Sequence, residues 1–101
     1  MPDSKPHKPD RCETCQREVE LTFHHLVPKK MHTKKPILRI HEEIDLMHYG
    51  SWVCKDCHKK IHKRFTHHQL ATWYYTVPRL LDDHKFRLFV EWVSKQKKRV
   101  K

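Results

Sequence analysis

The sequence predicts a small α+β domain in which two β-strands and a helix form a zinc-stapled core, followed by a C-terminal helical extension. Three observations support this. Two Cys-x-x-Cys pairs lie far apart in the chain, two short segments alternate apolar and polar residues, and helix-forming segments fill the C-terminal part. A chain of 101 residues buries a modest share of its surface, so a structural metal would add needed stability.

The composition points to an anionic partner. The formal net charge is +10 and the isoelectric point is about 9.7, so a positive potential attracts polyanions, with DNA as the expected partner and RNA as the alternative. No apolar run is long enough to cross a bilayer, and the segment 1–6 has no apolar core of a signal peptide. We therefore expect an intracellular, cytoplasmic protein in a reducing compartment, without a membrane partner.

Composition and motifs divide the chain into four parts. Residues 1–10 hold three prolines among polar and charged residues and are predicted to be a flexible basic arm. Residues 11–65 carry the cysteine and histidine motifs and form the predicted core. Residues 66–95 are the helical extension, expected to pack on that core, and residues 96–101 are a basic tail.

The core elements follow from hydrophobic periodicity. Alternation over residues 19–24 predicts a half-buried strand, and residues 51–54 predict a second strand paired with it. The long basic connection over residues 29–49 is expected to contain a short helical turn around residues 42–47. Good helix formers over residues 55–65 then predict a helix.

Capping signals organise the extension. Thr66 and Gln69 form a capping box that opens a helix to about residue 75, Pro78 suits a first helical turn, and Asp83 is placed to cap a final helix. The apolar stripe predicted for that helix consists of Phe86, Phe89, Val90 and Val93. The large aromatic side chains in the extension are predicted to be core residues rather than base-stacking groups: Trp73, Tyr74, Tyr75 and Trp92.

The four cysteines predict a structural zinc site. Tetrahedral Zn²⁺ takes two thiolates from each of two short turns, which matches Cys12 and Cys15 with Cys54 and Cys57. Two redox-active dithiols are the alternative, because the same motif occurs in oxidoreductases. A Cys₂His₂ site built from the second pair and two later histidines would leave the first pair without a metal.

The histidines suggest a second metal site. His24 and His25 stand at the predicted end of the first strand, while His58 and His62 lie one turn apart on the predicted helix. Neutral imidazole is a common metal ligand, so the two groups can converge on one divalent cation. Either half alone is a weak signal, but Cys57 ties the start of the helix to the scaffold that carries the strand.

Together these motifs resemble the HNH endonuclease family in its cysteine-bearing, zinc-stapled form. The resemblance rests on Cys-x-x-Cys, His-His-Leu-Val-Pro and Cys-x-x-Cys-His-x-x-Ile-His, which span residues 12–62. Residues 63–97 are similar to the helical extension of a group of short bacterial HNH proteins. The resemblance implies a ββα-metal (His-Me finger) fold and metal-dependent hydrolysis of DNA phosphodiesters, with 5′-phosphate and 3′-hydroxyl products.

The resemblance also implies residue roles. His24, His58 and His62 would bind a catalytic divalent cation (Mg²⁺, Mn²⁺, Ni²⁺ or Zn²⁺), and His25 would act as the general base. His48 stands where many family members have an asparagine that orients the base, so this role is carried to His48. The chemistry agrees, because a cation offsets phosphate charge and a base that is neutral near pH 7 suits histidine.

Basic side chains are the candidate phosphate contacts, which position nucleic acid without reading its sequence. They are Lys29, Lys30, Lys34, Lys35, Arg39, Lys59, Lys60, Lys63 and Arg64. Two other hypotheses share this surface: a non-catalytic, zinc-stapled nucleic-acid-binding protein, and a module whose helical extension docks on a partner. The first has no need of four clustered histidines, and the second predicts an exposed apolar face over residues 66–93.

Overall fold

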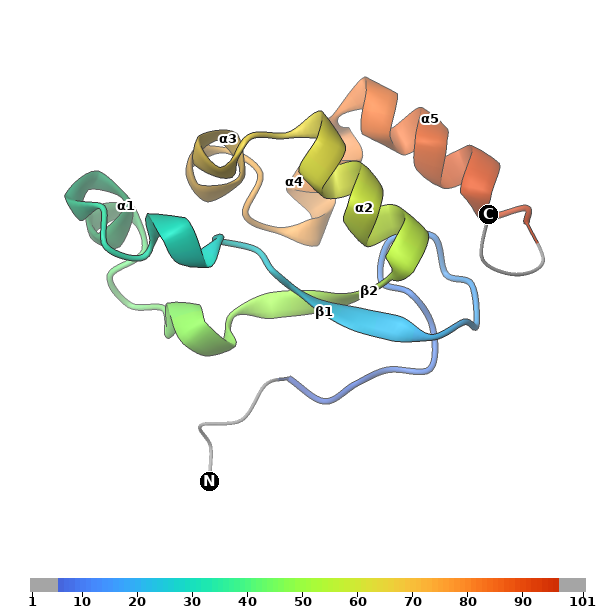
Figure 1. Ribbon diagram of the computed structural model, residues 1–101, viewed down its shortest axis with the longest axis horizontal. Helices are drawn as coiled ribbons and strands as arrows, with labels where there is room; N and C mark the ends of the chain where they lie inside the picture. Colours follow the sequence, from blue (N-terminus) through green and yellow to red (C-terminus); the bar gives the residue numbers. More distant parts are fainter. Residues whose placement is uncertain (1–5, 97–101) are drawn as a thin grey trace.

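A two-stranded antiparallel sheet followed directly by a helix forms the centre of the molecule (Figure 1). The computed structural model describes residues 6–96, so the predicted arm over residues 1–5 and the tail over residues 97–101 lie outside the described residues. Strand β1 (Leu21–His25) pairs with β2 (Gly50–Cys54), with His25 opposite Gly50 and Leu21 opposite Cys54. Helix α2 (Lys55–Arg64) begins where β2 ends and contacts both strands.

Both strands were predicted, with small differences in their bounds. β1 begins two positions after the predicted start and includes His25, since Val19 and Glu20 precede the ladder that pairs the two strands. β2 begins at Gly50, which passes very close to β1. A Cβ atom at this position would overlap the carbonyl oxygen of His24 and meet the ring of Phe23, so only glycine fits.

The connection between the strands contains more structure than the sequence predicted. It forms a 3₁₀ turn η1 (Lys29–Met31), helix α1 (Lys35–Ile40) and a 3₁₀ turn η2 (Leu46–His48). The sequence predicted one short turn around residues 42–47, so η1 and α1 were missed. Packing explains the difference, because the connection contributes to a second cluster of buried residues: Val27, Met31, Ile37, Leu46 and Ala71.

The extension forms three helices whose starts match the predicted caps. In α3 (His67–Thr72) the capping box of Thr66 and Gln69 is present, although the helix ends before the predicted residue 75. Pro78 lies in the first turn of α4 (Val77–Asp82), and the Asp83 carboxylate accepts the Phe86 amide at 2.9 Å at the start of α5 (His84–Val93). None of the helices within residues 6–96 combines the length and apolar character needed to cross a bilayer.

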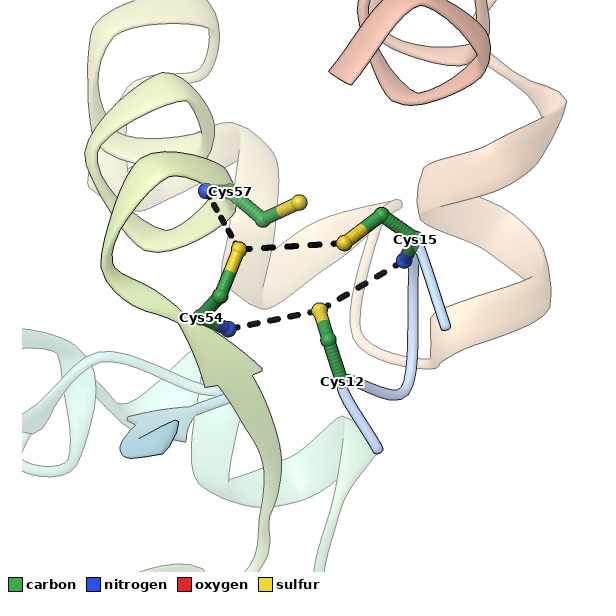
Figure 2. A group of neighbouring side chains, drawn as sticks. All are labelled: Cys12, Cys15, Cys54 and Cys57. Carbon is green, nitrogen blue, oxygen red and sulfur yellow. Dashed lines mark hydrogen bonds between the residues drawn. The ribbon is translucent and has the colours of Figure 1, made fainter. Parts of the chain in front are cut away.

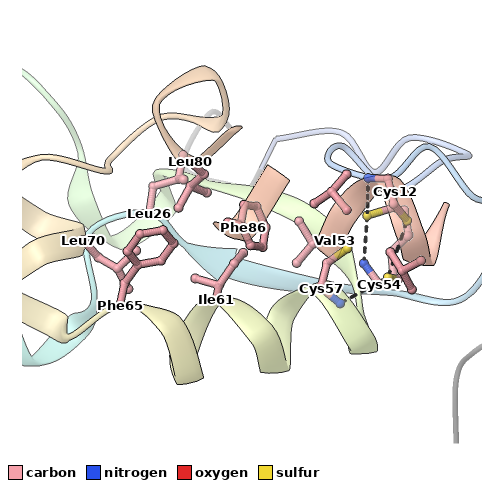
Figure 3. Close-up of a cluster of buried hydrophobic side chains, with 14 residues drawn as sticks. Cys12, Leu26, Val53, Cys54, Cys57, Ile61, Phe65, Leu70, Leu80 and Phe86 are labelled. Carbon is pink, nitrogen blue, oxygen red and sulfur yellow. Dashed lines mark hydrogen bonds between the residues drawn. The ribbon is translucent and has the colours of Figure 1, made fainter. Parts of the chain in front are cut away.

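One buried cluster joins the cysteine end of the sheet to the extension (Figure 3). The ring of Phe65 at the end of α2 lies between Tyr74 and Phe86, with centroid distances of 4.5 and 6.0 Å. The buried members of the cluster are Cys12, Cys15, Leu21, Leu26, Val53, Cys54, Cys57, Ile61, Phe65, Leu70, Leu80, Phe86, Val90 and Val93. The extension therefore completes the same core that the sheet and α2 begin.

Two tryptophans differ from their predicted place in the core. Trp73 is 53% exposed and Trp92 is 50% exposed, whereas Tyr74 and Tyr75 are half-buried. Trp73 follows the last residue of α3 and so leaves the packed face of that helix, and Trp92 lies off the stripe that α5 buries. Leu88, one turn before Trp92, is also exposed, so α5 presents a narrow apolar strip to solvent.

The described part of the predicted N-terminal arm lies against β2. The indole nitrogen of Trp52 donates to the carbonyl oxygen of Pro6 at 2.9 Å, and the Lys8 ammonium lies 5.7 Å from the Trp52 ring centroid. Trp52 therefore offers residues 6–10 both a hydrogen-bond donor and a cation–π surface, so this part of the predicted arm has contacts with the core.

Candidate metal centres

The four cysteines come together at one end of the sheet (Figure 2). Cys12 and Cys15 lie in the turn that precedes β1, Cys54 ends β2, and Cys57 lies in the first turn of α2. All four side chains are buried, and their sulfur atoms lie within 4.8 Å of one another. This arrangement offers four ligands from two short turns, as a tetrahedral structural metal such as zinc requires.

Backbone amides support the sulfur atoms. The amides of Cys15 and Cys54 donate to the Cys12 sulfur at 3.4 and 3.3 Å, and the Cys57 amide donates to the Cys54 sulfur at 3.4 Å. The first turn closes through Gln16, whose φ of 66° lies in the left-handed region and whose amide donates to the Cys12 carbonyl. Donors aimed at sulfur stabilise thiolates, so the backbone prepares these cysteines to bind a cation.

Arg17 adds a positive charge beside the thiolates. Its Nε donates to the Cys15 sulfur at 3.4 Å and its Nη2 donates to the Cys54 sulfur at 3.2 Å, while the same Nη2 forms a 3.0 Å ion pair with Asp56. The Arg17 side chain is only 5% exposed. Nothing in the sequence pattern distinguished Arg17 from the many other basic residues, because two of its three partners, Cys54 and Asp56, lie 37 and 39 positions away.

The protonation of the cysteines also favours a metal. Hydrogen bonds with Cys15, Cys54 and Cys57 lower the pKa of the Cys12 thiol, whereas contacts with Cys12, Cys15 and Cys54 raise the pKa of Cys57 far above its usual range. Without a bound cation, the four cysteines therefore cannot all be deprotonated at once. A divalent cation removes the conflict because it stabilises all four thiolates at once.

Three histidines form a second cluster between β1 and α2. The ring of His24 lies 5.2 Å from the rings of both His58 and His62, which are themselves 5.0 Å apart (centroid distances). One nitrogen from each ring can be chosen so that all three lie within 4.8 Å of one another. The expected convergence of the strand and helix histidines is therefore present, and it brings His24 together with two residues from successive turns of α2.

His24 is the unusual member of this cluster. The side chain is fully buried, yet neither of its ring nitrogens has a hydrogen-bond partner among residues 6–96. Burial, followed by the neighbouring charges of His58, His62 and His25, lowers the pKa of His24 to about 3, so the ring is neutral at pH 7. A buried imidazole normally pairs its nitrogens, and a cation would accept the unused lone pair, so the residues present fit a metal.

A pocket of about 260 Å³ opens beside the histidine cluster. His58 and His62 form part of its wall, and the remaining lining residues are Phe23, His25, Pro28, Lys29, Lys30 and His67. His67, whose ring lies 6.0 Å from that of His62, was not predicted from the sequence. It comes from the first turn of α3, and no local pattern indicates that this turn would face α2.

Several candidate residues are not brought to the pocket. The His48 ring pairs with Asp45 at 2.8 Å within the η2 segment and is not part of the pocket lining, so the role of orienting His25 has no support from this geometry. Arg64 forms a two-pronged pair with Asp83 at 2.8 and 2.9 Å. The remaining basic candidates are exposed or half-exposed outside the pocket: Lys34, Lys35, Arg39, Lys59, Lys60 and Lys63.

The fold and these sites define a small α+β protein with a four-cysteine centre suited to a structural metal such as zinc. Among curated proteins, the chain is similar to the uncharacterized protein YisB of Bacillus subtilis (strain 168), with 35% identity over 86 residues. The match covers 84% of this chain and 74% of YisB, and the chain belongs to the same family as YisB. No family model matches the chain, and no solved structure matches it.

Proposed function

We propose that this chain is a metal-dependent endonuclease of the HNH type, with a ββα-metal core that hydrolyses DNA phosphodiesters to 5′-phosphate and 3′-hydroxyl ends. The observation that carries the proposal is His24, a fully buried imidazole without a hydrogen-bond partner among residues 6–96, which faces two helix histidines. The order β1, β2, α2 and the sequence resemblance support the same assignment.

The proposed catalytic site consists of neutral ligands. His24, His58 and His62 would hold a divalent cation that stabilises negative charge developing on a phosphodiester. Burial lowers the pKa of His58 and His62 as well as that of His24, so all three can bind as neutral imidazoles. Three neutral ligands leave the full charge of the cation to attract an anionic substrate, and nitrogen ligands favour Zn²⁺ or Ni²⁺ over Mg²⁺.

His25 is the proposed general base. Successive side chains of a strand point to opposite faces, so His25 is directed differently from the buried His24 and lines the open pocket. There it would accept a proton from the attacking water. Lys29 and Lys30 from η1 and His67 from α3 line the same pocket and would contact the phosphate.

A nicking assay tests this proposal. Supercoiled plasmid is incubated with the full chain under a series of divalent cations, beside a His25→Ala variant and a His68→Ala control. His68 is exposed and lies outside the pocket lining. We expect metal-dependent nicking that falls by roughly 10²–10⁴-fold in His25→Ala and stays unchanged in His68→Ala.

The same assay separates the competing hypotheses. Full activity in His25→Ala, or cleavage without any divalent cation, would refute the proposed mechanism. Salt-sensitive DNA binding without cleavage under every cation tested would instead indicate the non-catalytic nucleic-acid-binding protein, because phosphate contacts alone give such binding.

A further inference from the structure

Thr22 connects the sheet to one of the proposed metal ligands. Its side-chain oxygen lies 3.1 Å from the carbonyl oxygen of Val53 and 2.8 Å from Nδ1 of His58. A carbonyl oxygen only accepts hydrogen bonds, so the single hydroxyl hydrogen of Thr22 is donated to Val53. The Thr22 oxygen is then an acceptor for His58, which means that Nδ1 of His58 carries the ring hydrogen.

We propose that Thr22 is a positioning residue of the histidine site, which holds His58 in the Nδ1–H tautomer and leaves the lone pair of Nε2 for the metal. The inference rests on the proposed function for the identity of that ligand. A metal-bound histidine commonly donates its other ring N–H to a neighbouring oxygen, which fixes the tautomer and the orientation of the ring. Thr22 supplies that oxygen here.

The strand geometry explains why this residue can act on the site. Thr22 and His24 are two positions apart on β1, so their side chains project from the same face of the strand, towards α2. Thr22 is also paired in register with Val53, the residue immediately before Cys54. The hydroxyl therefore joins the His58 ring to a strand position that is anchored by the four-cysteine site.

The hydrogen bond between Thr22 and His58 matters for metal binding because a neutral imidazole has two tautomers. An unconstrained histidine favours the Nε2–H form, in which the lone pair lies on Nδ1 and Nε2 cannot bind a cation. If Thr22 holds the other form before the metal arrives, no proton has to be exchanged between the ring nitrogens on binding. Removal of the hydroxyl should weaken binding without moving any ligand.

Two substitutions separate the hydroxyl from the shape of the side chain. Thr22→Val keeps the branched shape and the strand preference but has no hydroxyl, whereas Thr22→Ser keeps the hydroxyl. Thermal unfolding and zinc content of the full chain show whether each variant folds with the cysteine site loaded. Both variants are compared with the unchanged chain under identical conditions.

The first measurement is the tautomer of His58, read from the ¹⁵N chemical shifts of its ring in the chain with only the cysteine site loaded. We expect Nδ1–H in the unchanged chain and in Thr22→Ser, and a shift towards Nε2–H in Thr22→Val. The second measurement is a titration of the histidine site with Ni²⁺, where Thr22→Val should bind about 10–100-fold more weakly and Thr22→Ser nearly as tightly as the unchanged chain.

The outcomes distinguish this inference from the proposed nuclease activity. An Nε2–H tautomer in the unchanged chain, or equal tautomers in the unchanged chain and Thr22→Val, overturns the role of Thr22 even if metal-dependent cleavage is observed. If the unchanged chain binds no Ni²⁺ at the histidines, the proposed metal site fails, as does the ligand role of Nε2. The ¹⁵N measurement then still decides whether Thr22 sets the tautomer.

Discussion

Replacement of Arg17 by methionine should weaken the cysteine site without touching a ligand. Methionine fills a similar volume but removes the donors to the sulfurs of Cys15 and Cys54 and the ion pair with Asp56. A hydrogen bond to a charged group contributes about 1.5–3 kcal/mol, and breaking a buried ion pair costs about 3–5 kcal/mol. These contributions overlap in one side chain, so we expect a total of roughly 3–5 kcal/mol.

Part of this lost stabilisation should appear as weaker zinc binding. If the whole loss appeared as weaker metal binding, zinc affinity would fall by roughly 10²–10⁴-fold, since 1.4 kcal/mol corresponds to a factor of ten. The assay is competition with a coloured zinc chelator, measured beside thermal unfolding of the same preparation. Arg17→Lys serves as the matched variant, because it keeps the charge but not the planar fork that reaches two sulfurs and a carboxylate.

We therefore expect the unchanged chain to bind zinc most tightly, Arg17→Lys more weakly, and Arg17→Met most weakly of the three. Cys54→Ser sets the lower limit, because it removes a ligand and should release the zinc and unfold the domain. Zinc affinity and thermal stability of Arg17→Met equal to those of the unchanged chain would show that the guanidinium is not needed, and the electrostatic argument would be wrong.

Three further predictions follow from the packing and the histidine cluster. Gly50→Ala should lower the free energy of unfolding by roughly 2–3 kcal/mol and weaken metal binding at the histidines, because the added Cβ displaces His24; urea unfolding and Ni²⁺ titration measure both effects. Asp83→Ala should cost about 1–2 kcal/mol by removing both the cap of α5 and the partner of Arg64, whereas the exposed neighbour Asp82→Ala should change stability by less than about 0.5 kcal/mol in the same urea experiment. Because the pKa of His24 falls from 6.5 to about 3 on folding, the unfolded chain takes up a proton that the folded chain does not as the pH drops through this window. Stability without added metal should then decrease by roughly 2–4 kcal/mol more between pH 7 and 4 than in His24→Asn, and equal pH profiles would contradict the assigned pKa.

The sequence was informative where structure depends on neighbours along the chain. The two cysteine turns, the strand before Pro28, the helix after Cys54 and the caps at Thr66 and Asp83 are all local patterns, and the structure contains each of them. The connection between the strands was less predictable. Its helix α1 is short and is held by Ile37, which packs in a cluster with residues from the extension rather than with its own neighbours.

The supporting residues of the candidate sites could not be predicted for the same reason. Arg17 and Thr22 act beside groups that are 37 and 36 positions away, and His67 shares the pocket with His25 and Lys29 from an earlier part of the chain; none of the three belongs to a spaced motif. His48 shows the converse limit. Its place was inferred from the resemblance, but its ring pairs with the nearby Asp45, since a local carboxylate competes with any longer-range role.

The sheet, α2 and the C-terminal helices share one apolar core, which limits how the cysteine and histidine motifs can be transferred between proteins. Phe86, Val90 and Val93 of α5 fill the same apolar interior as Cys54 and Cys57, so the helices that follow residue 65 are not an optional appendage. Melting should be one cooperative event in which loss of α5 opens the cysteine centre to solvent. The histidine and cysteine motifs therefore cannot be moved into another protein as a self-sufficient cassette, and any recipient scaffold would have to supply its own equivalent of that apolar face.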